Sequence, residues 1–468
     1  MSEAPIARTR LRRVRARIPI KRHLSATQII LLGFLALIAL GTLLLCLPIS
    51  SADGVFTSPR YAGFTAVSAS CVTGLTVVDT GTYWNTFGHV VIILMIQIGG
   101  LGFMTMAVMM SLFIKRQITP RERVVVAQSL GLTGYGGTIA LVRRILIGTF
   151  TIEGIGAIIL ASRFIPLFGV GRGIWYGVFH AISAFCNAGF DILGGYGGAF
   201  SSFTAVADDP VITVTLISLI VLGGIGFVVW DDFVNLLWKR QRLSVYTKFV
   251  LTLTAILLFG GAALIALCEW NNPATLAGMS VGEKLLACLF QSATTRTAGI
   301  DMINQSAMTE SAQFISMLLM LVGGCSGSTA GGMKVGTVGI VICAVLAFTR
   351  GEDDVVIWRR RVSHETVVRA LTVVGIDLAA AFTATLIILQ TTPDATLIAA
   401  LYETCSGIAT VGLSLSLTPA LSLAGHLAVM ALMFFGRVGI LTITYSVLLR
   451  NAQRKSCISY PEITMMIG

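Results

Sequence analysis

Charged side chains are scarce in this sequence of 468 residues. Asp, Glu, Lys and Arg make up 12% of the chain, whereas hydrophobic residues make up 55%. An average soluble domain has about 25% charged residues. So few charges cannot cover a water-exposed surface, so most of the chain must face lipid or membrane-buried protein. The composition therefore argues against a soluble multidomain enzyme.

Catalytic and metal-binding patterns are also missing. The sequence has no HExxH, GxSxG or CxxC motif, and no paired carboxylates lie within its apolar segments. The nine Cys lie mostly in apolar segments and are interpreted as small buried hydrophobic residues. The five His are scattered along the chain. We therefore expect no enzymatic activity and no resident metal.

Long apolar segments are abundant instead. A bilayer core of about 30 Å requires roughly 20 helical residues. The first of these segments, residues 29–47, is longer than the apolar core of a signal peptide, which has about 7–15 residues, so we interpret it as a helix that is retained in the mature protein. Eight segments are long enough to span: 29–47, 90–114, 139–160, 212–230, 249–267, 314–348, 367–389 and 423–449.

The basic residues are distributed unevenly between the two ends of these segments. With eight spans, both termini lie on one side, and 26 of the 33 Lys and Arg fall on that side. Positive loops remain cytoplasmic, so both termini are predicted to be cytoplasmic in a multi-pass protein of the cytoplasmic membrane. The net charge of +11 thus reflects orientation and contact with anionic lipid, not binding of nucleic acid. A basic arm that binds an acidic partner remains an alternative for residues 1–26.

Four shorter semi-apolar stretches lie between alternate long segments. They cover residues 61–71, 174–185, 281–294 and 394–406, each too short to span. Such lengths suit re-entrant helices, which are tolerated where they are buried in protein or line water. His180 is the only His near them.

Each short stretch leads into a turn that contains glycine, and the four turns align. They read SCVTGLT, FCNAGFD, TRTAGID and IATVGLS, with the aligned glycines at 74, 189, 299 and 412. A second glycine cluster follows each of them, at offsets of 25, 34, 24 and 24 residues. The sequence therefore predicts four concatenated helix–pore-loop–helix repeats.

The repeated glycine turns are suited to removing the water that surrounds a cation. A K⁺ filter replaces the water around the ion with rings of backbone carbonyls, and glycine permits the required backbone at little steric cost. The carbonyl end of each short helix also favours a cation. A role of the glycines in close helix packing alone is the alternative. The predicted K⁺-binding residues are Val72, Thr73, Gly74, Asn187, Ala188, Gly189, Thr297, Ala298, Gly299, Thr410, Val411 and Gly412.

The sixth apolar segment is interrupted by the sequence GGCSGSTAGGMK, residues 323–334. Each glycine within a helix costs about 1 kcal/mol relative to Ala, so we expect an intramembrane loop below the filter. A passive kink is the alternative, and the phosphate-binding-loop pattern is not met. The predicted gate residues in this loop are Gly323, Gly324, Ser326, Gly327, Ser328, Thr329, Gly331 and Gly332.

Arg437 lies within the last apolar segment. An intramembrane Arg is costly and usually faces a polar cavity. Its charge below the filter would repel a permeating cation, so we assign Arg437 to the gate as well. Pairing with a buried carbonyl or with a short-helix end is the alternative.

The motifs NAGFD, TRTAG, GSTAGG and GRVG make nearly the whole chain similar to the ion-conducting subunits of the Ktr/Trk/HKT superfamily of K⁺ transporters. One apolar segment precedes the first short stretch, and the chain ends on YPE followed by a terminal Ile-Gly, so it resembles a KtrB-type subunit. No TVGYG-type filter is present, and Asn187 and Arg296 break strict symmetry. The resemblance therefore implies a short filter and leaves Na⁺ passage open.

The resemblance implies K⁺ uptake through a channel-like pore in an all-α polytopic membrane protein with pseudo-fourfold symmetry. It also implies a homodimer and a separate cytoplasmic ring of nucleotide-binding, KtrA-type regulatory subunits, so that nucleotide acts only through the partner. Na⁺ as a stimulator is left open, as is a Na⁺ or Na⁺/K⁺ secondary transporter with alternating access. The loops proposed to dock the ring are 115–123, 239–248 and 350–369.

These expectations divide the chain as follows. A cytoplasmic basic arm covers residues 1–26, repeat 1 covers 27–115, repeat 2 covers 136–240, repeat 3 covers 246–349 with its intramembrane loop at 323–334, repeat 4 covers 364–450, and a cytoplasmic C-terminal tail covers 451–468.

Overall fold

A computed structural model describes residues 26–102, 105 and 138–439 of the chain. The expectations for the basic arm, the loop at 115–123 and the C-terminal tail with its YPE motif lie outside the described residues.

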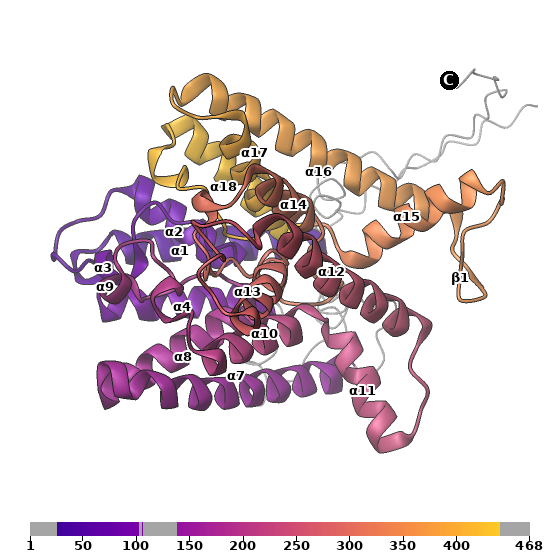
Figure 1. The fold of residues 1–468 in the computed structure, drawn as a ribbon, viewed down its shortest axis with the longest axis horizontal. Helices are drawn as coiled ribbons and strands as arrows, with labels where there is room; N and C mark the ends of the chain where they lie inside the picture. The colour runs from indigo at the N-terminus through magenta and orange to yellow at the C-terminus, as the bar shows by residue number, and fades with distance from the viewer. Residues whose placement is uncertain (1–25, 103–104, 106–137, 440–468) are drawn as a thin grey trace, which may run out of the picture.

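Four helices are long and apolar enough to cross a membrane. They are α1 (Ala26–Cys46), α7 (Thr138–Phe168), α12 (Val245–Glu269) and α16 (His364–Thr391). In Figure 1, α7 and α16 run along opposite edges of the molecule, with the shorter helices between them. Large apolar side chains on these helices are exposed, such as Ile158 at 72% and Leu267 at 81%. A surface of this kind suits lipid, so the chain folds as a helical multi-pass membrane protein.

One predicted span is not a single long helix. The segment predicted at 212–230 is broken into α10 (Pro210–Gly224) and α11 (Phe227–Lys239), whose axes differ by 96°. Gly226, the second of the two residues between them, has φ +97°, a conformation that ends a helix and that glycine adopts without strain. Among the described residues, four helices therefore qualify as spans, or five if the bent pair counts as one. Eight continuous spans are not found there.

Three further predicted spans contain shorter apolar helices, and residues 103–104, 106–114 and 440–449 of two of these spans lie outside the described residues. These are α4 (Thr86–Leu101), the pair α14 (Glu310–Leu321) and α15 (Val335–Thr349), and α18 (Leu423–Val438). Helices α4 and α18 end at Gly102 and Gly439, which have φ values of +84° and +85°. These two glycines and Gly226 each lie three residues after the first glycine of the second cluster in their repeat. The same residue type thus ends the helix in three of the four predicted repeats.

The four predicted short stretches are helical, with bounds within a few residues of the prediction. They are α2 (Pro59–Cys71), α8 (Val170–Cys186), α13 (Val281–Thr294) and α17 (Leu397–Ala409). Helix α13 begins with a capping box, in which Ser280 and Glu283 satisfy each other's backbone N–H groups. Each of these helices is buried over its last turns, which places its carbonyl end inside the protein.

Short elements complete the fold. They are η1 (Pro48–Ser50), α3 (Thr80–Tyr83), α9 (Gly194–Gly197), η2 (Thr204–Val206), η3 (Gln305–Ala307), η4 (Thr418–Ala420) and the antiparallel strands β1 (Val356–Ile357) and β2 (Arg360–Arg361).

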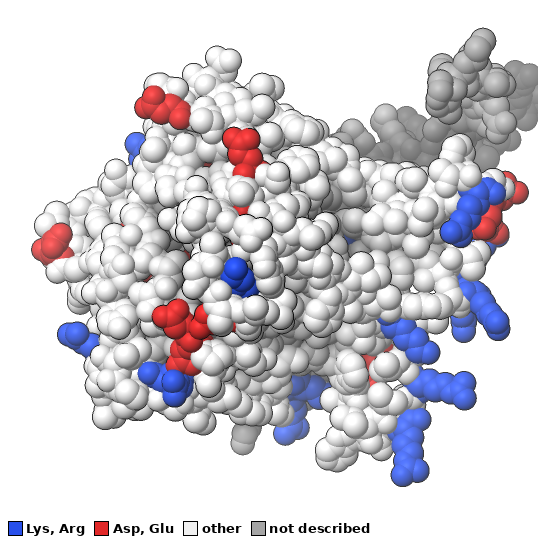
Figure 2. Space-filling model, in the orientation of Figure 1, with Lys and Arg blue, Asp and Glu red and all other residues white. Residues whose placement is uncertain are grey.

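Basic residues are concentrated at one end of the molecule. Figure 2 shows most of the visible Lys and Arg gathered at the end formed by α11 and the β1 hairpin, whereas the rest of this face carries most of the visible Asp and Glu and only a few Lys and Arg. The exposed basic residues there include Arg240, Arg242 and Arg359 to Arg361. A concentration of basic residues at one end is the pattern that the positive-inside rule produces.

Candidate functional site

The four turns that follow the short helices share one backbone conformation. The aligned glycines 74, 189, 299 and 412 have φ values of +95°, +69°, +68° and +101°. The residue two positions earlier is also left-handed in every turn: Val72 at +59°, Asn187 at +58°, Thr297 at +73° and Thr410 at +52°. Positive φ is rare for these residue types and costs on the order of 1–3 kcal/mol each. Four copies of the same strained turn indicate a shared structural requirement.

The four turns touch one another in a closed ring. A Cβ on Gly74 would lie 2.6 Å from the carbonyl oxygen of Ala188 and 2.9 Å from the Cα of Gly189. In the same way Gly189 faces Ala298 and Gly299, Gly299 faces Val411 and Gly412, and Gly412 faces Thr73 and Gly74. Any larger residue would strike the backbone of the next turn, so only glycine permits this packing.

One cavity opens onto this ring. Its volume is about 640 Å³, and all four aligned glycines line it. Three carboxylates that are not among the residues predicted from the sequence also line it: Asp79, Asp191 and Asp301. The Oδ1 atom of Asp301 is buried without a hydrogen-bond partner. The cavity therefore combines backbone at its base with acidic groups on its wall.

The acidic groups influence one another. Burial raises the pKa of Asp301 to about 8, with a further contribution from the negative charge of Asp191. Burial likewise raises the pKa of Asp191 to about 6, with Asp79 adding to the effect. Both shifts favour the neutral carboxyl when the cavity holds no cation. A bound cation would oppose them.

Hydroxyl groups from the short helices hold the turns in place. The Oγ atoms of Ser68 and Ser406 accept hydrogen bonds from the backbone N–H groups of Gly74 and Gly412, at 3.1 and 3.0 Å. Ser183 donates to the carbonyl of Phe190 at 2.6 Å, and Thr294 donates to that of Ile300 at 2.7 Å. Each turn is thus tied to its own short helix.

The second glycine clusters lie against the ends of the short helices. A Cβ on Gly99, Gly223 or Gly436 would meet the backbone carbonyl of the residue four positions before the aligned glycine of that repeat: Ser70, Phe185 or Ile408. The regular offsets in the sequence therefore correspond to one repeated close approach. In repeat 3 the corresponding Gly323 meets Gly331 of the intramembrane loop instead.

The loop between α14 and α15 folds back on itself beside the ring. The backbone N–H of Gly323 donates to Met333 at 2.8 Å, and that of Val335 donates to Gly324 at 3.0 Å. A Cβ on Gly332 would lie 2.9 Å from the Cα of Ala409, at the end of α17. All of the predicted gate residues between 323 and 332 fall in this loop.

The loop is also bonded to repeat 2. Cys325 donates its backbone N–H to Gly224 at 2.9 Å, and Phe227 donates to Gly327 at 2.8 Å. The hydroxyl of Thr329 donates to the carbonyl of Phe185 at 3.0 Å. The loop therefore occupies the break between α10 and α11, which explains why that span is bent.

Arg437 joins the loop to two helices. Its guanidinium donates to the carbonyl of Thr329 in the loop. It also donates to the carbonyls of Gly99 and Gly100 at the end of α4, at 2.5 and 2.8 Å. Carbonyls are the partners that an intramembrane Arg requires, so the alternative of pairing with buried carbonyls describes this geometry. The same contacts connect it to the loop.

Lys334 is the second basic residue within the apolar segments, and it stabilises the intramembrane loop by an internal bond. Its ammonium donates to the carbonyl of Ala330 at 2.7 Å.

Asp231 and Asp232 do not line the cavity at the ring: Asp231 pairs with Arg144, and Asp232 accepts from the hydroxyl of Thr247. Among the described residues, no group of three or more His, Cys, Asp or Glu is placed to hold a metal.

Comparison with known proteins places this arrangement in a family. The family model of the TrkH cation transport proteins matches residues 17–456. The potassium/sodium uptake protein NtpJ of Enterococcus hirae is 38% identical over 96% of this chain and 98% of its own length. The Ktr system potassium uptake protein B of Bacillus subtilis is 37% identical over 94% of this chain and 96% of its own.

A solved structure has the same fold. The potassium transporter TrkH of Vibrio parahaemolyticus superposes with a TM-score of 0.70 at 16% identity, over 93% of this chain and 87% of that one. The family consists of ion transporters and not of enzymes, in agreement with the expectation from the sequence. The chain therefore belongs to the TrkH family of cation transport proteins.

Proposed function

We propose that this protein takes up K⁺ across the cytoplasmic membrane through a channel-like pore whose filter is the ring of four glycine turns. The observation that carries the proposal is the closed contact between Gly74, Gly189, Gly299 and Gly412 at the base of one acidic cavity. Four carboxyl-terminal helix ends around this ring favour a cation, and the turns supply backbone carbonyls to replace its water.

Four helix–pore-loop–helix repeats around one axis account for this ring. Their support is the repeated left-handed conformation two residues before each glycine, and the repeated approach of the second glycine clusters. The intramembrane loop and Arg437 form the gate in this proposal. The loop lies between repeats 2 and 4, and Arg437 holds it through Thr329.

The proposal extends to assembly. The Ktr-system relatives support a partner regulatory subunit, which we propose to be a cytoplasmic nucleotide-binding ring. The ring would dock on the basic end shown in Figure 2, with the pore subunit as a homodimer and both termini on that side. Regulation by nucleotide would then reach the gate from outside this chain.

Uptake in cells that lack their own K⁺ transport tests the proposal. Cells that express this chain with its partner subunit should grow at low external K⁺ and accumulate K⁺ and Rb⁺. Failure to restore growth, with the protein present in the membrane, would reject the function.

An alternating-access transporter for Na⁺, or for Na⁺ and K⁺, is the second candidate. The Enterococcus hirae relative is described as a potassium/sodium uptake protein, which supports Na⁺ as a candidate transported ion. Initial flux measured against ion concentration separates the two mechanisms. A pore continues to respond to concentrations at which a slow transporter has saturated, and uptake of K⁺ with and without Na⁺ tests Na⁺ stimulation.

A further inference from the structure

A buried polar side chain occupies the same place in all four repeats. In each repeat a linker joins the glycine turn to the next helix, which begins after an N-cap: Asn85, Asp209, Thr309 or Ser422. The residue four positions after the N-cap is polar and at most 8% exposed in every case: His89, Thr213, Gln313 and His426. A buried polar group costs free energy unless it is bonded, so its partner shows its role.

In three repeats this side chain bonds to the linker. The Nε2 atom of His89 lies 2.8 Å from the carbonyl oxygen of Thr80. The Nε2 atom of Gln313 donates to the carbonyl of Gln305 at 3.2 Å, and the Nε2 atom of His426 lies 2.9 Å from that of Thr418. Thr80, Gln305 and Thr418 are each the first residue of a short helical turn: α3, η3 and η4. All three lie six residues after the aligned glycine.

His and Gln can make the same bond because each places an N–H donor, Nε2, at the same number of bonds from the backbone. A carbonyl oxygen only accepts, so the facing ring nitrogen of each His must carry the proton and donate, as the amide of Gln313 does. Nε2 is three bonds from Cβ in both His and Gln. Arg60, at the start of α2, donates to Nδ1 of His426 at 2.9 Å and so fixes the tautomer with the proton on Nε2.

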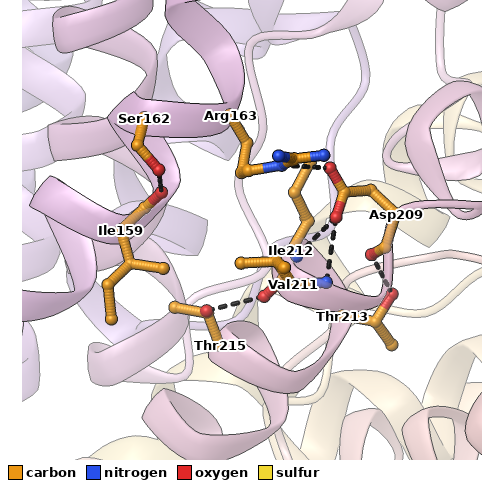
Figure 3. Close-up of polar contacts among 8 residues, drawn as sticks. All are labelled: Ile159, Ser162, Arg163, Asp209, Val211, Ile212, Thr213 and Thr215. Carbon is orange, nitrogen blue, oxygen red and sulfur yellow. Dashed lines mark hydrogen bonds and ion pairs between the residues drawn. The ribbon is translucent and has the colours of Figure 1, made fainter.

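Repeat 2 departs from this pattern, as Figure 3 shows. Thr213 is too short to reach its linker, and its hydroxyl donates to the carbonyl of Asp209 at 3.0 Å. Asp209 itself is held by Arg163 of α7 at 2.6 Å. The longer linker of this repeat is tied elsewhere: His180 of α8 accepts from the backbone N–H of Ile192 at 3.1 Å. Every linker is thus tied, but repeat 2 by a different helix.

We propose that His89, Gln313 and His426 are positioning residues for ion selectivity, which tie the linker after each filter turn to the next helix. The inference rests on the proposed function, since it concerns the same filter. A carbonyl ring distinguishes ions only if it resists collapse around the smaller one. The short-helix hydroxyls hold each turn at the aligned glycine or at the residue after it. The bond from His89, Gln313 or His426 holds the chain six residues after that glycine. Together the two bonds restrain the backbone on which the filter carbonyls depend.

His89 offers the sharpest test because two substitutions separate its bond from its bulk. His89→Phe keeps an aromatic ring, which contacts Phe179 at 6.0 Å between centroids, but removes the donor. His89→Gln keeps the donor and removes the ring, as repeat 3 does naturally. His364→Phe, at the exposed first turn of α16, is the matched control.

The measurement is the ratio of K⁺ to Na⁺ uptake in vesicles that contain equal amounts of purified protein. His89→Phe should lower this ratio by about 3- to 10-fold, the range for one hydrogen bond, whereas His89→Gln and His364→Phe should keep it within about 2-fold. If His89→Phe does not fold, the pair Gln313→Leu and Gln313→His asks the same question, with His expected to retain the ratio.

Three results would overturn the inference. They are a normal ratio in both donor-free variants, an equal loss in the Phe and Gln variants of His89, or a wild-type protein that conducts K⁺ and Na⁺ equally. Each of these leaves K⁺ flux in place. Absence of any K⁺ flux through the wild type would instead reject the proposed function, and with it this inference.

Discussion

Replacing Arg437 with Gln should increase the flux of K⁺ through the resting protein. The guanidinium makes three bonds to carbonyls, but only the bond to Thr329 joins the intramembrane loop to α18. A hydrogen bond to a charged group contributes about 1.5–3 kcal/mol. Gln is shorter than Arg and carries no charge, so it cannot span from α18 to the loop and to the end of α4 together.

The magnitude follows from this one bond. Each 1.4 kcal/mol is a factor of ten, so a loss of about 1.5–3 kcal/mol shifts the equilibrium of the loop by roughly 10- to 150-fold. If about 1% of the molecules have the loop displaced at rest, the fraction becomes about 10–60% in Arg437→Gln. Loss of the positive charge below the filter acts in the same direction, because that charge repels a permeating cation.

The assay is the initial rate of ⁸⁶Rb⁺ uptake into vesicles without the partner subunit, at matched protein content. Arg437→Gln should exceed the wild type by at least about 10-fold, and Arg437→Lys should lie between them because Lys keeps the charge but not the fork of donors. Arg369→Gln, which removes an exposed Arg paired with Glu365 on α16, is the control and should not change the rate in the absence of the partner subunit. An unchanged rate in Arg437→Gln would remove this residue from the gate.

Two other predictions concern the filter and its cavity. Gly74→Ala places a Cβ 2.6 Å from the carbonyl oxygen of Ala188, at φ +95°, and should lower the ratio of K⁺ to Na⁺ uptake by at least about 10-fold; a normal ratio would show that the ring is not the filter. The raised pKa values of Asp191 and Asp301 predict that uptake at low K⁺ rises between about pH 6 and 8, as the carboxyls ionise and attract cations. Asp301→Asn should flatten this profile, and an unaltered profile would contradict the assignment.

Repetition made the turns predictable from sequence. Four aligned glycines at regular offsets indicated four equivalent segments, and α13 spans the same residues that were predicted for it, because Ser280 and Glu283 mark its start. The intramembrane loop was predictable for a different reason, since five glycines within twelve residues are incompatible with a continuous helix.

The features that were missed depend on conformation or on distance along the chain. Averaged hydropathy treats 212–230 as one span because it does not register that Gly226 adopts φ +97°. Asp301 follows the third aligned glycine by two residues, but Asp191, whose charge acts on it, and Asp79, whose charge acts on Asp191, come from other parts of the chain. The bond between Arg60 and His426 joins residues 366 positions apart, and periodicity within a repeat gives no sign of it.

The circular contact of the turns has a consequence for biosynthesis. Gly412 packs against Thr73 and Gly74, so the last turn to leave the ribosome completes a circle with the first. Arg60 of α2 donates to the carbonyl of Leu421 at 2.7 Å, a bond that cannot form until the C-terminal part of the chain has been synthesised. A nascent chain that has inserted three repeats therefore has an open side where the fourth belongs, and no complete ring to bind ions. If the ring is the filter, as proposed above, completion of the chain and assembly of the conduction path coincide, and a partly synthesised chain cannot form the complete filter.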